Sequence, residues 1–133
     1  MSAAAGLAYA VAALGLVFTT VLMLYASEPW NAGVGRWAMI LPFAVLALSP
    51  YLIIARLARR FRGDGVKARA LRAVAVLVTA PAIYFYVMGF LIEPDPQSGL
   101  LFVFLPIYQL LAGAVAGMAI WLLVSAYRRW RVR

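Results

Sequence analysis

The chain has 133 residues, of which 67% are hydrophobic, with a mean hydropathy of +0.97 and a formal net charge of +8. A soluble chain of this size must cover much of its surface with polar groups, so this composition excludes a soluble domain and predicts a membrane protein. Because the sequence contains neither cysteine nor histidine, it also excludes disulfides, thiolate nucleophiles and histidine-ligated metals.

The basic residues gather in two clusters, at 56–72 and 128–133, and each cluster directly follows a hydrophobic segment. A charge of +8 on a soluble protein would suggest nucleic-acid binding. Arginines and lysines beside membrane spans are explained more simply by the preference of membrane proteins for basic cytoplasmic loops. We therefore expect the lipid bilayer and anionic lipid headgroups at the cytoplasmic face as partners, and no nucleic acid.

Hydrophobic segments at residues 3–26, 36–56, 72–92 and 99–127 each reach the length of about 20 residues that a helix needs to cross a bilayer. The first segment exceeds the apolar core of a signal peptide, about 7–15 residues, and no Lys or Arg precedes it, which favours a retained helix over a cleaved signal. Together the segments predict a single membrane domain over residues 1–133, with loops at 27–35, 57–71 and 93–99 and a tail at 128–133.

Charge predicts the orientation. The loops after the first and third segments carry Glu28, Glu93, Asp95 and one basic residue, Arg36, whereas the other eleven of the twelve basic residues lie on the opposite side with Asp64. This bias predicts an all-α, four-helix transmembrane bundle of two antiparallel hairpins, with both termini in the cytoplasm. Arginine outnumbers lysine and alanine is abundant, so we expect a bacterial inner (cytoplasmic) membrane.

Gln109 is the only amide deep inside a predicted span. It lies about 15 Å below the start of its helix at 1.5 Å per residue, near the bilayer midplane. Similar depths are reached by five hydroxyl residues, so one intramembrane polar cluster is possible: Thr19, Thr20, Ser49, Tyr84 and Tyr86. Such a cluster could contact a small molecule or lipid headgroup or line a permeation path, or it could form hydrogen bonds that fix how the helices pack.

Small residues form a second candidate site. Gly113, Ala116 and Gly117 share one face of the last span, and Ala12 and Gly15 share one face of the first. Faces of this kind let two helix backbones touch. They could pack on each other within the chain, or on a second copy or partner subunit.

Two functions remain open. The first is a non-enzymatic structural or accessory subunit that self-associates or docks on a larger membrane complex. The second is a small transporter, channel or pore-forming protein acting as an oligomer. An enzyme is less favoured, because the spans contain no carboxylate and the loop acids lie at a wet interface that gives little reason for a shifted pKa. We assign no catalytic, cofactor-binding or metal-binding residues.

Overall fold

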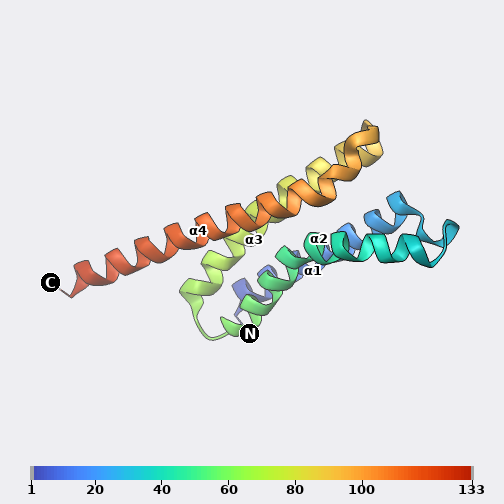
Figure 1. The fold of residues 1–133 in the computed structure, drawn as a ribbon. Helices are drawn as coiled ribbons and strands as arrows, with labels where there is room; N and C mark the ends of the chain where they lie inside the picture. The colour runs from blue at the N-terminus through green and yellow to red at the C-terminus, as the bar shows by residue number, and fades with distance from the viewer. Residues whose placement is uncertain (1, 133) are drawn as a thin grey trace.

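Figure 1 shows the computed structural model, which describes residues 2–132. All regular structure in this range is helical, and no strand occurs within it. The long helices are α1 (Ala3–Ser27), α2 (Val34–Arg60), α3 (Gly65–Val87) and α4 (Leu101–Arg131), with the short helices η1 (Pro29–Asn31), η2 (Met88–Ile92) and η3 (Pro96–Leu100) in the turns. Between residues 2 and 132, four helices are therefore long and apolar enough to cross a membrane, which confirms the all-α prediction.

The turn between α2 and α3 is shorter than the predicted loop at 57–71, because only residues 61–64 lie outside a helix. Asp64 caps α3: its Oδ1 accepts hydrogen bonds from the backbone N–H groups of Val66 at 3.2 Å and Lys67 at 3.1 Å. This cap pairs two donors that a helix N-terminus otherwise leaves unsatisfied. α3 can therefore begin at Gly65, well before the predicted hydrophobic segment at 72–92.

The other two turns lie at the opposite end of the molecule. α1 stops at Ser27 because Glu28 adopts a left-handed backbone with a φ of 42°, and the next residue is a proline. Between α3 and α4, the Ser98 hydroxyl donates to the carbonyl of Gly89 at 2.6 Å, and Asp95 Oδ1 accepts from the N–H of Gln97 at 2.7 Å. We call the end of the molecule that holds these two turns the acidic end, and the end that holds residues 61–64 the basic end.

α1 packs against α2 and α3, and α4 packs against the same two helices, so α1 and α4 occupy diagonal positions. The helices diverge at both ends (Figure 1). At the acidic end the α1–α2 turn separates from the α3–α4 turn, and at the basic end α4 runs past the α2–α3 turn.

Two apolar clusters form the core. The cluster nearer the basic end is made by α1, α2 and α3 alone: Ala8, Ala12, Tyr51, Ile54, Ala58, Leu71, Ala75 and Val78. The cluster nearer the acidic end includes α4: Leu22, Met23, Ala47, Ala82, Tyr86, Phe102 and Leu105. Alanines at the contacts let the helix backbones approach closely. Two members of the first cluster, Tyr51 and Val78, are hydrogen-bonded by Gln109 of α4.

Candidate functional site

A buried polar cluster joins all four long helices. The Gln109 amide on α4 donates one hydrogen bond to the Tyr51 hydroxyl on α2 at 3.0 Å and another to the Val78 carbonyl on α3 at 3.2 Å. The Thr19 hydroxyl on α1 lies 3.5 Å from the same Tyr51 oxygen. The side chains of Thr19, Tyr51 and Gln109 are at most 1% exposed. We call Thr19, Tyr51, Gln109 and the Val78 carbonyl the central polar cluster.

Gly15 creates the space for the Tyr51 ring. A Cβ atom at position 15 would overlap that ring, with Tyr51 Cδ1 only 2.7 Å away. Real Cβ contacts are never this short, so position 15 of α1 must be glycine for Tyr51 to occupy its site. Ala12 and Ala8, one and two turns earlier on the same face of α1, are buried as well. The small-residue face of α1 therefore receives a tyrosine from α2.

The Gln109 amide can be oriented only one way. The Val78 carbonyl can accept but not donate, so the amide nitrogen must face it. The amide oxygen Oε1 then points elsewhere, and it has no hydrogen-bond partner among the described residues. The same holds for two other buried oxygens, those of the Thr79 and Tyr86 hydroxyls. An unpaired buried polar group costs about 1–3 kcal/mol of stability, so these three oxygens are polar groups of the bundle whose hydrogen-bonding capacity the described residues leave unused.

Of the six polar residues predicted from depth, Gln109 and Thr19 belong to the central polar cluster. Tyr86 is buried beside it but packs its ring on Phe102, with ring centroids 5.3 Å apart. The hydroxyls of Thr20 and Ser49 instead donate to carbonyls of their own helices, those of Leu16 and Leu46 respectively, both at 2.8 Å. Tyr84 is 60% exposed on the outside of α3.

Tyr51 and Thr79 were missed by the sequence analysis, although Tyr51 is the residue on which the cluster converges. The signal available in the sequence was Gly15, which lies in a line of alanines on one face of α1. A residue without a side chain at such a position leaves space for a large side chain from a neighbouring helix. The sequence could not say which helix would supply that side chain.

The two small-residue faces have different neighbours. Ala12 and Gly15 are buried inside the bundle, where Gly15 meets Tyr51. On α4, a Cβ added to Gly113 would meet only Val78, at 3.9 Å, and one added to Gly117 would meet nothing within 4 Å. Ala116 between them is half-buried. The structure thus uses the α1 face internally and leaves most of the α4 face open.

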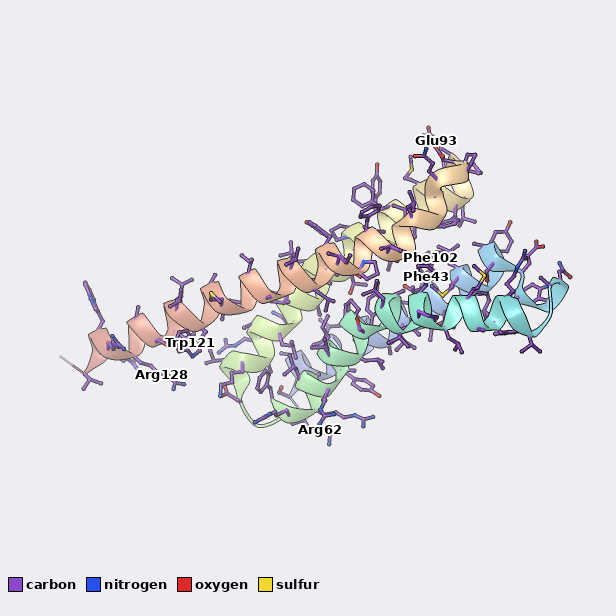
Figure 2. The ribbon with its side chains drawn as sticks, viewed as in Figure 1. Phe43, Arg62, Glu93, Phe102, Trp121 and Arg128 are labelled. Carbon is purple, nitrogen blue, oxygen red and sulfur yellow. The ribbon has the colours of Figure 1, made fainter. Side chains whose placement is uncertain are left out.

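A groove of about 350 Å³ runs beside this open part of α4. One wall comes from the end of α2 and the start of α3, and the other from α4, with Gly113 and Gly117 on the α4 side. Figure 2 shows Trp121 and Arg128 on the side of α4 that faces the α2–α3 turn, and both line the groove. The apolar part of the lining consists chiefly of Leu57, Leu71, Val74, Ile120, Trp121 and Val124.

The loop acids serve the turns. Glu28 Oε2 accepts from the Asn31 amide at 3.0 Å, and Asp95 caps η3. Arg36 donates to the Ser27 carbonyl at 3.1 Å. Across residues 2–132, no three acidic side chains gather in a way that could hold a metal ion. The side chains of the central polar cluster carry only uncharged hydroxyl and amide groups, and these groups form hydrogen bonds with one another and with the Val78 carbonyl.

No protein-family model, curated protein or solved structure matches this chain.

Proposed function

We propose that the chain is a non-enzymatic structural or accessory subunit of a bacterial inner membrane, which self-associates or docks on a larger membrane complex through the second half of α4. In this proposal the four long helices cross the bilayer as two antiparallel hairpins. The acidic end faces outward, and the basic end and both termini lie in the cytoplasm. The charge bias between the two ends supports this orientation.

The burial pattern of α4 carries the proposal. The buried residues of this helix are Phe102, Leu105, Pro106 and Gln109, all in its first third. From position 110 to position 132 none is buried, and large apolar side chains such as Val115 and Leu123 are 68% and 70% exposed. The second half of α4 therefore has no buried residue, and its most shielded positions, such as Gly113 and Ala116, are only half-buried.

A docking role explains this better than contact with lipid alone. Small residues in membrane helices concentrate where helices touch, because they let backbones approach. On α4, Val115 and Ala119 are exposed one turn apart, on the side of the helix away from Gly117. This side offers a large and a small residue together to another protein.

The central polar cluster supports a structural role for the rest of the chain. Its hydrogen bonds connect α1, α2, α3 and α4 at one level, and its side chains are fully buried. Interhelical hydrogen bonds of this kind fix how membrane helices pack. The cluster would then hold a small bundle in one arrangement and present α4 to a partner.

Purification from native membranes at low detergent tests the proposal. We expect the chain to migrate with a second copy or a stoichiometric partner, and a variant with Val115→Ser and Leu123→Ser to lose that association. A matched control on α1, Val17→Ser and Val21→Ser, changes side chains of similar exposure and should keep it. A monomer without partners in the parent protein would contradict the proposal.

A small transporter or pore-forming protein is the second candidate, and one observation favours it. The unpaired oxygens of Thr79, Tyr86 and Gln109 are buried, and a polar solute could satisfy them during passage. Solute or ion flux in liposomes that contain the purified chain would support this candidate. The subunit proposal predicts no flux above that of empty liposomes.

A further inference from the structure

We propose that the groove beside the second half of α4 binds one anionic phospholipid, with an acyl chain between α3 and α4 and the headgroup between Lys67 and Arg128. This proposal needs the chain to lie in a membrane, but it does not depend on the role as a subunit. It assigns an occupant to an open space that the helices themselves leave unfilled.

The dimensions and lining of the groove fit an acyl chain. From Gly113 to Val124, α4 rises about 16 Å at 1.5 Å per residue, which is close to one leaflet of a bilayer core about 30 Å thick. Over this length the walls are apolar, with Leu71 and Val74 on α3 opposite Ile120 on α4. The volume of about 350 Å³ lies within the range of pockets that hold small molecules.

The charges lie at one end of the groove, at the level expected for headgroups. Lys67 and Arg128 line its mouth, and no acidic residue lines it. Lys67 forms the single salt bridge found among the described residues, with Asp64 at 3.3 Å. Both partners are exposed to solvent, and exposed pairs are weak, so the ammonium group can also contact a phosphate. An apolar slot that ends in two cations matches a lipid with a negative headgroup.

A helix from a second copy fits this groove less well. A second copy in the same orientation would bring its own Arg128 and Arg129 to the level of this mouth, and like charges there would repel. The face of α4 on the other side of the helix, with Val115 and Ala119, remains available for protein contacts.

The two glycines keep the slot open. A Cβ atom at Gly117 would meet nothing within 4 Å, so a longer side chain at this position would extend into the groove without disturbing the fold. Gly117→Leu should therefore block the acyl chain. Ala119→Leu is the matched control, because helical spacing places position 119 on the opposite face of α4 and it is exposed.

Tryptophan quenching tests the site, because Trp121 lines it. In a background with Trp30, Trp37 and Trp130 replaced by Phe, brominated phosphatidylglycerol is titrated into the detergent-solubilised full-length chain. We expect quenching of Trp121 to saturate near one lipid per chain, and brominated phosphatidylcholine to quench more weakly. Lys67→Gln and Arg128→Gln should each reduce the preference for phosphatidylglycerol roughly fivefold, the effect of one basic residue beside an anionic surface.

The controls decide the outcome. Arg62→Gln and Arg129→Gln, made as separate variants, each remove one positive charge outside the groove and should keep the preference. Gly117→Leu should weaken quenching by both lipids, while Ala119→Leu should leave it unchanged. The proposal is overturned if the parent protein does not distinguish the two lipids, if the control charge variants lose the preference equally, or if Gly117→Leu behaves like Ala119→Leu.

Discussion

The Tyr51 hydroxyl is the atom at which the packing of this chain converges, since it accepts from Gln109 and lies beside Thr19. Its ring occupies a space that exists only because residue 15 is glycine. The hydrogen bond from Gln109 and the close contact with Gly15 thus both depend on the Tyr51 side chain. Substitutions at Gln109 and at Gly15 test these two interactions separately.

Gln109→Leu should destabilise the bundle by about 1 kcal/mol, because it removes two interhelical hydrogen bonds and such bonds average about 0.6 kcal/mol in membrane proteins. Unfolding of the detergent-solubilised chain by dodecyl sulfate measures the change. Tyr108→Leu, which alters an exposed neighbour on α4, should have little effect. Equal stability of Gln109→Leu and the parent would show that the hydrogen bonds do not hold the helices.

Gly15→Ala should cost about 1–3 kcal/mol of stability, since it overpacks the contact with the Tyr51 ring. Gly117→Ala serves as the comparison, because a methyl group there meets no neighbour, and it should be neutral or stabilising. The same unfolding assay reports both. If Gly15→Ala proved as stable as Gly117→Ala, the close approach of α1 to Tyr51 would be wrong.

Residue depth could be read from the sequence, but residue direction could not. Counting from the start of the predicted span places Gln109 near the bilayer midplane, and in the structure its side chain is buried between the helices. The same counting grouped Tyr84 with Tyr86, although the first is 60% exposed and the second is buried. Direction around a membrane helix depends on which neighbours pack against it, and a uniformly apolar span gives little periodic signal.

At the scale of the helices, the α3 N-terminus is the element whose stability depends on pH. The backbone N–H of Lys67 is the largest of several hydrogen-bonding and charge effects that lower the pKa of Asp64 below its ordinary value of 3.8. A lowered pKa means that the fold favours the carboxylate, so the cap contributes fully above that ordinary value. Its contribution is lost as the pH falls through the lower pKa of the folded state.

Nuclear magnetic resonance of the amide groups of Val66 and Lys67 should detect this loss. We expect their signals to shift as the pH is lowered below 3.8, while those in the middle of α3 stay constant. In Asp64→Asn, which cannot titrate, the transition should disappear. A transition that persisted in Asp64→Asn would assign the pH dependence to another group.

Helix positions were largely predictable because each hydrophobic segment of the sequence lies within a helix or the turn that continues it. Helix ends were not. α2 continues into the basic region and ends at Arg60, and α3 already begins at Gly65. The start of α3 is set by its cap and not by a change in polarity. The lack of buried residues after position 109 of α4 also has no local signal, because residues 110–127 are as free of charge as residues 101–109.

At the scale of the whole molecule, the proposed orientation can be tested with single cysteines, since the chain has none of its own. Ala32 lies in the turn after α1 and Gly63 in the turn after α2, and both are exposed. In intact spheroplasts, Ala32→Cys should react with a membrane-impermeant maleimide. Gly63→Cys should react only after permeabilisation. The reverse pattern would place the basic end outside and invert the topology.

The open half of α4 is the feature on which the proposed function depends, and photo-crosslinking in native membranes tests it most directly. Benzoylphenylalanine is introduced at Leu122 on α4, which is 55% exposed, and at Val17 on α1, which is 58% exposed, as the control. We predict a discrete crosslinked protein product, either a second copy or a partner subunit, from position 122 and none from position 17. Absence of any protein product at position 122, or the same product at both positions, would contradict the docking role of α4.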